Sequence, residues 1–257
     1  MLKFIVTNAV KFAVLIVSLF LCLSSLASAM SVNPVVVDLK SSGSQARSQI
    51  NVINTLTYEL PVEITISKIS LSETGEIETV AVSGDNFLIF PPQALIQPGA
   101  TQVFRVQWIG EPDLSESETY AFSVAQLPVE LTEGVNGIQL LYNFQVVTNV
   151  APVKGKPDLE LLETDISVDD EGVAHPVLTV KNNGSAHGYL SATRLRLEMR
   201  DGTNKKIWSE TYEPTELAQS MGLGLVQPSK TRKITLPIDL PQSDGSLKVS
   251  FKYVGRQ

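Results

Sequence analysis

The sequence predicts an all-β protein made of two antiparallel β-sandwiches. Runs in which apolar and polar residues alternate recur along the chain, and this period of two is typical of strands with one buried face. Turn residues separate the runs at short intervals, as in sandwiches of many short strands. A segment rich in proline, glycine and lysine, residues 151–157, divides the 257 residues into two strand-rich blocks. Two domains are also the ordinary expectation for this length.

Residues 1–29 are predicted to be a secretory signal peptide. Lys3 and Lys11 precede or flank an apolar run at 12–23, and Ala27-Ser28-Ala29 is a small-x-small cleavage site. A membrane anchor is the alternative, but the apolar run is shorter than the roughly 20 residues that a spanning helix needs. We therefore expect an exported protein whose mature chain begins near Met30.

The first block, residues 30–152, is predicted to consist of strands joined by tight turns. Val62, Ile64 and Ile66 alternate with polar residues, as strand residues with one buried face do. Further alternating runs lie at 49–52, 103–108 and 120–124, and turn signals lie at 42–44, 73–75 and 97–99. In such turns proline presets φ and glycine permits a positive φ. The pattern predicts one complete sandwich.

The second block, residues 153–257, repeats this organisation. Leu178 and Val180 lead into a turn at 181–184, and Leu195, Leu197 and Met199 lead into a turn at 200–202. Later alternating runs lie at 234–238 and 247–253. Residues 213–221 are the only helix candidate, and this segment is too short and glycine-bounded to support a helix prediction.

The residue inventory argues against an enzyme, a metalloprotein and a nucleic-acid-binding protein. Cleavage after Ala29 would remove the only cysteine, Cys22, and with it any disulfide or thiolate chemistry. His175 and His187 each stand beside a turn without ligand spacing, so we expect both at the surface. The acidic run 165–171 lacks the spacing of a calcium loop and is expected to be a solvated hairpin turn. The formal net charge of −7 disfavours binding to a phosphate backbone. We therefore expect no catalytic residue, no cofactor, no metal and no nucleic-acid partner.

One predicted strand, residues 137–150, is the strongest candidate for a binding element. Ile138, Leu140, Tyr142 and Phe144 occupy one face of it. At about 3.3 Å per residue such a strand would reach roughly 40 Å, whereas an ordinary strand has about 5 to 6 residues. It could extend beyond its own sheet and offer an apolar edge for pairing. An ordinary long core strand bent at a bulge fits the residues equally well.

Several motifs of the first block occur in a recognisable order. NPVVVDL at 33–39 opens the block, PP at 91–92, PG at 98–99 and QVFRV at 102–106 follow, and GIQLLY at 137–142 precedes the linker. In this order they resemble the periplasmic chaperones of chaperone–usher pilus assembly. NNGSAH at 182–187 resembles a turn in the second domain of that family. The resemblance covers the whole mature chain and implies two immunoglobulin-like β-sandwiches set in an L.

The resemblance also implies a function and its partners. In that family the long strand completes the incomplete sandwich of a pilus subunit, which is a form of β-augmentation, and here Ile138, Leu140, Tyr142 and Phe144 would supply the side chains. The protein would hold pilus subunits in the periplasm and deliver them to an outer-membrane usher. Whether the free protein caps the strand by dimerising is left open. The alternative is a secreted two-domain structural or adhesive component of the cell surface.

The chain departs from the family pattern at the positions that grip the subunit. Relatives hold the subunit's C-terminal carboxylate with basic residues, whereas this chain has Pro34 among apolar residues in the first strand and Gln139 in the donor strand. Asn143 stands where relatives place an arginine that bridges the domains. Arg105 and Arg47 are candidates for a relocated carboxylate anchor, although an exposed arginine is the simpler expectation for Arg105. Backbone pairing alone, or a diverged subunit, would also account for the departure.

Overall fold

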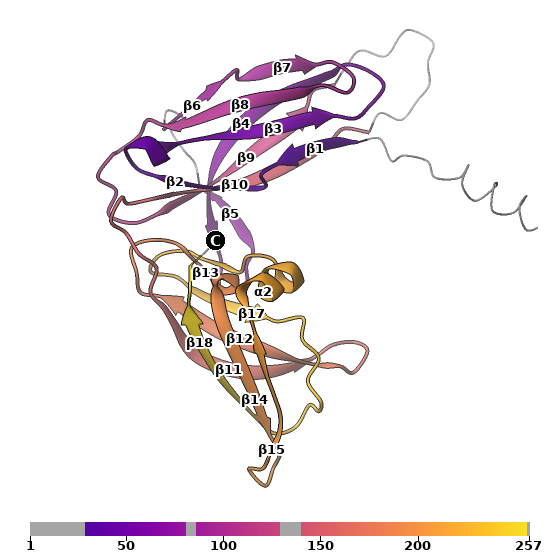
Figure 1. The fold of residues 1–257 in the computed structure, drawn as a ribbon, viewed down its shortest axis with the longest axis vertical. Coiled ribbons are helices and arrows are strands. Elements are labelled where there is room, and N and C mark those ends of the chain that lie inside the picture. The colour runs from indigo at the N-terminus through magenta and orange to yellow at the C-terminus, as the bar shows by residue number, and fades with distance from the viewer. Residues whose placement is uncertain (1–28, 81–85, 129–139, 256–257) are drawn as a thin grey trace, which may run out of the picture.

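The computed structural model describes residues 29–80, 86–128 and 140–255, which form two β-sandwiches in succession along the chain (Figure 1). The long axis of the first sandwich runs across the view and that of the second runs down it, so the two form an L (Figure 1). This architecture confirms the predicted all-β class and the two sandwiches.

The first sandwich has two facing sheets. One has the strand order β1-β3-β8-β6, and the other has the order β2-β10-β9-β4-β5, with β7 also paired to β4. The strands are β1 (Met30–Asn33), β2 (Val36–Lys40), β3 (Arg47–Asn54), β4 (Leu60–Leu71), β5 (Ile77–Val80), β6 (Phe87–Phe90), β7 (Gln93–Ile96), β8 (Thr101–Trp108), β9 (Glu118–Gln126) and β10 (Asn143–Ala151), with a 3-10 turn at Ser44–Ala46.

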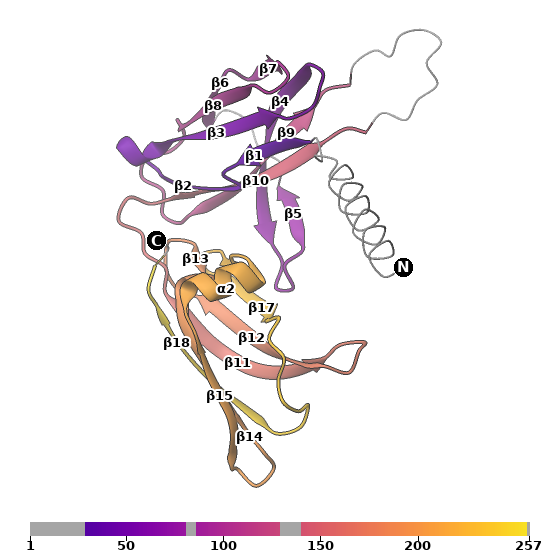
Figure 2. The same cartoon turned by 45° about the vertical axis from the view of Figure 1, so that its right-hand side comes forward.

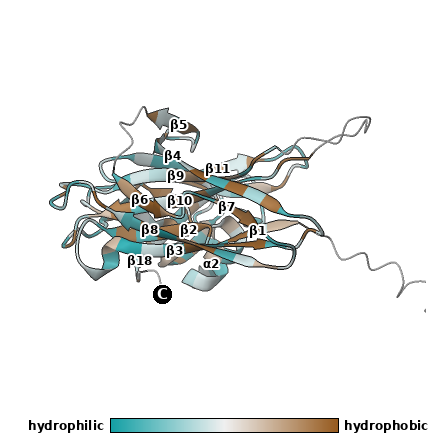
Figure 3. Cartoon of the chain, turned by 90° about the horizontal axis from the view of Figure 1, so that it is seen from above, coloured by the Kyte–Doolittle hydropathy of each residue, from teal (hydrophilic) through white to brown (hydrophobic). Residues whose placement is uncertain are grey.

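The core of the first sandwich follows from the alternation in the sequence. Phe104 and Val106 on β8 and Tyr120 and Phe122 on β9 are buried, while the residues between them are more exposed. Bands of polar and apolar colour alternate along these strands in the view from above (Figure 3). Phe87 packs edge-on against the rings of Tyr120 and Phe122 with centroids 4.8 and 4.9 Å apart. These T-shaped contacts join the two sheets at one end of the sandwich.

The second sandwich is built from three small sheets and one helix. The sheet orders are β11-β12-β17, β13-β16 and β15-β14-β18. The strands are β11 (Leu159–Val168), β12 (Ala174–Asn182), β13 (Gly188–Tyr189), β14 (Thr193–Arg200), β15 (Lys206–Tyr212), β16 (Leu225–Val226), β17 (Thr231–Thr235) and β18 (Ser246–Tyr253), with a 3-10 turn at Leu190–Ala192. Its core contains the fully buried Leu178, Leu190, Leu195 and Leu197.

The acidic run 165–171 was predicted to be a hairpin turn; its first residues belong to β11, and the turn itself begins at Asp169. The last residue of β11, Val168, pairs with Ala174. Between them, the Oδ1 of Asp169 accepts hydrogen bonds from the backbone N–H groups of Glu171 and Val173 at 3.0 and 2.8 Å. The carboxylate is therefore used to close the turn, as aspartate side chains commonly do.

Helix α2 (Pro214–Met221) corrects the expectation that this segment is too short for a helix. Proline occupies its first turn, and the Glu213 N–H donates to Glu216 Oε2 at 2.8 Å as part of a capping box. Leu217 is fully buried against the core of the second sandwich. Capping and one buried leucine therefore compensate for a length that would be marginal in isolation.

The two sandwiches are joined by residues 152–158, because β10 ends at Ala151 and β11 begins at Leu159. The predicted signal peptide lies outside the described residues, apart from Ala29. In the part of the chain that the structure describes, no helix is long and apolar enough to cross a membrane.

Candidate functional site

Strand β10 has an open edge over the first part of its length. On one side it pairs with β9 from Asn143 to Val150. On the other side it pairs with β2 only from Val147 to Ala151, where the parallel pairing begins opposite Val36. Among the described strands, none pairs with the outer side of β10 before Val147. We call residues 140–146, which lie along this open edge, the edge segment.

The hydrogen bonds on either side of β10 show which backbone groups point to the open edge. The Val147 N–H donates to the Val35 carbonyl at 3.0 Å, whereas the Tyr142 carbonyl accepts from the Gln126 N–H on the opposite side at 2.8 Å. Because successive residues of a strand direct their backbone groups to opposite edges, the N–H and C=O groups of Asn143 and Gln145 point outward. They are placed to pair with an added strand.

The side chains of the edge segment divide between exposed and packed positions. Leu140 and Leu141 keep 66% and 45% of their surface exposed, so neither contributes much to the core. Tyr142 and Phe144 are half-buried and pack against the core of the first sandwich. The segment therefore offers exposed leucines at its start, and its later aromatic side chains are already anchored in the protein's own sandwich.

The described strand is shorter than the predicted one. The prediction began the strand at residue 137, whereas β10 begins at Asn143. Leu140 lies before the strand, and Ile138 and Gln139 lie outside the described residues. The alternation was predicted correctly within β10, where Phe144 and the buried Val146 share the inward face.

The point where β2 closes the open edge is apolar. Val35 is 57% exposed there, and it is flanked by Pro34 and Val36. The basic residue of β2, Lys40, lies at the far end of that strand, where its Nζ donates to the Pro152 carbonyl at 3.2 Å. Where β2 begins to pair with β10, a bound strand would therefore meet apolar side chains and not a basic residue.

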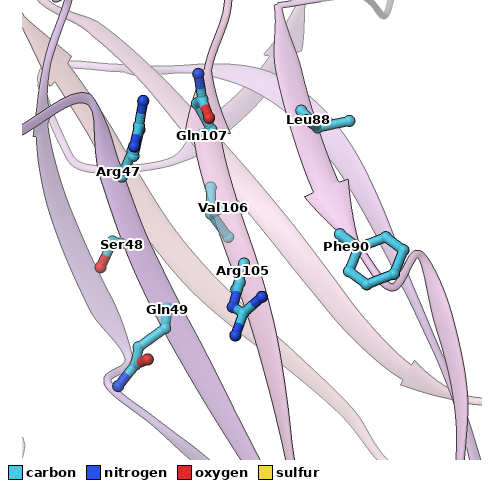
Figure 4. A pocket seen from close by; sticks show the side chains of 8 residues that line it. All are labelled: Arg47, Ser48, Gln49, Leu88, Phe90, Arg105, Val106 and Gln107. Carbon is cyan, nitrogen blue, oxygen red and sulfur yellow. The ribbon is translucent and has the colours of Figure 1, made fainter. Parts of the chain in front are cut away.

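Arg47 and Arg105 lie together, but on the other sheet. Arg47 on β3 is opposite Gln107 on β8, and Arg105 on β8 is opposite Gln49 on β3. Both arginines are exposed and, with Phe90 and Leu88 of β6, line a shallow hollow on the outer face of the four-stranded sheet (Figure 4). A carboxylate held by these arginines would therefore lie on the sheet opposite the one that contains the edge segment.

The other end of the β2–β10 pair is held by polar contacts to the second sandwich. His187 Nε2 lies 3.1 Å from Asp38 Oδ1 of β2, and the Tyr189 hydroxyl donates to the same carboxylate at 2.5 Å. The amide of Asn149 on β10 donates to the Tyr189 hydroxyl at 2.8 Å. His187 also has its backbone N–H and Nδ1 within 3.1 Å of the Ser117 hydroxyl. We call these five residues the junction network.

A second contact between the sandwiches involves the β4–β5 hairpin, which extends from the first sandwich toward the second (Figure 2). Gln227, which is 8% exposed, accepts from the Leu71 N–H at 2.8 Å and donates to the Ile69 carbonyl at 3.2 Å. The Lys233 N–H donates to the Glu73 carbonyl at 2.8 Å. Together with the junction network, these bonds fix the second sandwich relative to the open edge.

The expectation that both histidines lie at the surface is wrong for His187, whose side chain is only 8% exposed. His175 is also largely covered, with a side chain 17% exposed, and its Nε2 lies 3.2 Å from Asp169 Oδ2. This hydrogen bond and a second one to the Ile238 carbonyl raise the pKa of His175. The motif NNGSAH was the one signal in the sequence that pointed to a special role for His187.

Tyr120, Glu118 and Lys68 form a cluster of titratable groups in the first sandwich. Burial raises the pKa of Tyr120, whose hydroxyl donates to Glu118 at 2.5 Å. Lys68 forms an ion pair with the same carboxylate. Within the described ranges, no group of three or more His, Cys, Asp or Glu side chains could hold a metal ion.

Sequence comparison gives no relative. No protein-family model matches the chain, and no curated protein sequence is significantly similar to it. The fold is therefore the basis for comparison.

Solved structures with similar folds are fimbrial chaperones and their complexes. A chain of the complex between a chaperone and the tip adhesin of CFA/I fimbriae is 13% identical, with 90% of this chain and 94% of that chain covered and a TM-score of 0.52. A chain of the Salmonella enterica SafA pilin complex with the SafB chaperone is 14% identical, with 90% and 98% covered and a TM-score of 0.51. The class 5 fimbriae chaperone CfaA is 12% identical, with 86% and 98% covered and a TM-score of 0.50. The protein therefore has the two-domain fold of these chaperones, which confirms the fold that the resemblance implied.

Proposed function

We propose that the protein is a periplasmic chaperone that binds pilus subunits by donor-strand complementation. The observation that carries the proposal is the open edge of β10, with outward backbone groups at Asn143 and Gln145 and exposed side chains at Leu140 and Leu141. The similarity in fold to chaperones that are found with pilins and tip adhesins supports it.

The open edge would act by adding a strand. A subunit strand beside β10 would form main-chain hydrogen bonds with Asn143 and Gln145, and these bonds do not depend on the subunit's sequence. Ile138 and Leu140, which share one face of the predicted strand, would provide apolar side chains that fill the gap in the subunit's sandwich. Where β2 takes over at Val36, the added strand would have to end. Backbone pairing and apolar contact would therefore provide most of the affinity.

The remaining parts of the proposal concern export, delivery and the free state. The signal peptide predicted at residues 1–29 would direct the chain to the periplasm. The chaperone would then pass its subunit to an outer-membrane usher. In the absence of a subunit, a second copy could cover the edge segment, because unprotected strand edges tend to pair with one another.

Fractionation with pull-down tests the proposed function. A tagged copy is expressed in its own host together with the pilin-like subunits of that host, and the periplasm is released by osmotic shock. We expect the protein in the soluble periplasmic fraction, bound to a smaller β-rich chain that mass spectrometry identifies as a subunit. Recovery of the protein within a polymer on the cell surface would instead support the structural or adhesive alternative.

A further inference from the structure

A group of basic side chains covers the outer face of one sheet of the second sandwich. Strand β14 alternates buried residues with outward ones, and its neighbours β15 and β18 continue the same outward face. Arg194 lies opposite Lys252, and Arg200 lies opposite Lys206. We call this set of outward basic residues the basic face: Arg194, Arg196, Arg200, Lys206, Lys248 and Lys252.

The basic face keeps a positive balance after its ion pairs are counted. Arg194 pairs with Glu213 at 2.8 Å, and Arg200 pairs with Glu198 at 2.5 Å. Glu198 lies inside the basic face, and its pKa is lowered by Arg200, with smaller contributions from Lys206 and Lys248. Arg196, Lys248 and Lys252 are exposed. This concentration of positive charge occurs in a chain whose formal net charge is −7.

Several acids of the second sandwich lie on the other sheet. Its edge strand β11 carries the exposed Glu160, Glu163 and Asp165. Glu163 lines one hollow with Arg200 and Lys248 of the basic face, so it offsets part of the positive charge there. Six basic side chains against Glu198, Glu213 and Glu163 leave the basic face with a positive balance.

The composition of the basic face favours a charged surface over a folded protein partner. The outward positions between the basic residues are occupied by Glu198, Ser209, Thr211, Ser246 and Ser250. Ile207, at the β-bulge of β15, is the exposed apolar neighbour. Protein interfaces depend on a few buried aromatic or large apolar anchors. A broad sheet face with cations and small hydroxyl groups instead suits a layer of phosphate groups.

We propose that the basic face binds reversibly to the surface of a membrane that contains anionic phospholipids. The ligand chemistry is the phosphate of the headgroups, and the bound state relies on ionic attraction without insertion. The inference goes beyond the proposed chaperone function, because the edge segment belongs to the first sandwich and the basic face to the second. Binding through the second sandwich would leave the edge segment free for a subunit.

Vesicle sedimentation tests this proposal independently of any subunit. The mature protein is mixed with vesicles of phosphatidylcholine alone, or of phosphatidylcholine with phosphatidylglycerol, over a series of salt concentrations. We expect sedimentation only with the anionic vesicles, and loss of binding as salt increases. Arg196→Gln, Lys248→Gln and Lys252→Gln together should lower the partition coefficient roughly a hundredfold, at about fivefold per basic side chain.

A matched variant separates the basic face from the net charge of the protein. Lys181→Gln, Lys230→Gln and Lys233→Gln remove the same number of cations from the β11-β12-β17 side of the second sandwich. This control should bind the anionic vesicles nearly as well as the unaltered protein. Equal losses in the two variants would overturn the proposal, and so would a failure of the unaltered protein to bind at low salt. Melting curves of both variants check that each remains folded.

Discussion

Replacing Leu140 with aspartate should greatly weaken the proposed subunit binding while leaving the protein folded. Leu140 is 66% exposed and lies before the first residue of β10. Substitutions at exposed positions away from special features usually change stability by less than about 0.5 kcal/mol. We therefore expect circular dichroism and the melting temperature of Leu140→Asp to match those of the unaltered protein.

The expected loss of binding is much larger. Full burial of a leucine is worth about 1.5–3 kcal/mol, and the exposed two-thirds of Leu140 would contribute about 1–2 kcal/mol on pairing with a subunit. A carboxylate in the same place adds a further burial cost of at least about 1–3 kcal/mol. At about 1.4 kcal/mol per factor of ten, the dissociation constant should rise by roughly thirtyfold to several thousandfold.

Calorimetric titration or quantitative pull-down with a purified subunit measures this change. Leu162→Asp is a matched control, because Leu162 is a leucine of the second sandwich with 50% exposure. It should leave both folding and binding unchanged. Phe144→Asp should behave differently from both, since Phe144 packs against the core and its loss should lower the melting temperature. If Leu140→Asp lost its melting transition along with binding, residue 140 would be a core position and the reasoning would fail.

Three further predictions concern other parts of the molecule. The hydrogen bond to Asp169 raises the pKa of His175, so protonated His175 stabilises the fold fully below its ordinary pKa of about 6.5, and this stabilisation is lost as the pH increases through the raised pKa. His175→Gln should remove this part of the dependence of melting temperature on pH. Melting curves with the same pH dependence in the variant and the unaltered protein would refute the prediction. His187→Ala removes the contact to Asp38 and should destabilise the junction between the sandwiches by about 1–3 kcal/mol. The loss should be seen as faster proteolysis between the two sandwiches. An unchanged cleavage rate would show that other contacts hold the junction together. Chelators should alter neither the melting temperature nor subunit binding, and a shift of the transition on chelation would disprove this.

Strands with local alternation could be predicted from the sequence. β8 (Thr101–Trp108) is an example, since Phe104, Val106 and Trp108 are two residues apart and all three are buried. The period of two is a local property, and it survives whatever sheet the strand joins. The same reasoning located Leu140 and Phe144 on one side of the long strand, but it could not show that Phe144 packs on the protein's own core.

Contacts between distant segments could not be predicted. Asp38 and His187 are 149 residues apart, and the burial of His187 depends on how the second sandwich meets the first. Helix α2 was missed for a different reason, because its stability comes from a capping box and from Leu217 in the core. The positions of Arg47 and Arg105 also follow from sheet pairing, which places them on neighbouring strands of one face that the sequence pattern does not identify.

The open edge has a simple structural cause in the first residues of the domain. The chain forms β1 in the four-stranded sheet, crosses at Pro34 and Val35, and forms β2 in the other sheet beside β10. A single uninterrupted strand along β10 would have covered Asn143 and Gln145. Because the strand is divided, β10 is protected from Val147 onward and uncovered before it. An exposed apolar edge usually promotes aggregation, so its presence at one defined place supports the proposed pairing with a partner strand. The junction network lies at the protected end, and this arrangement holds the second sandwich close to the edge without covering it.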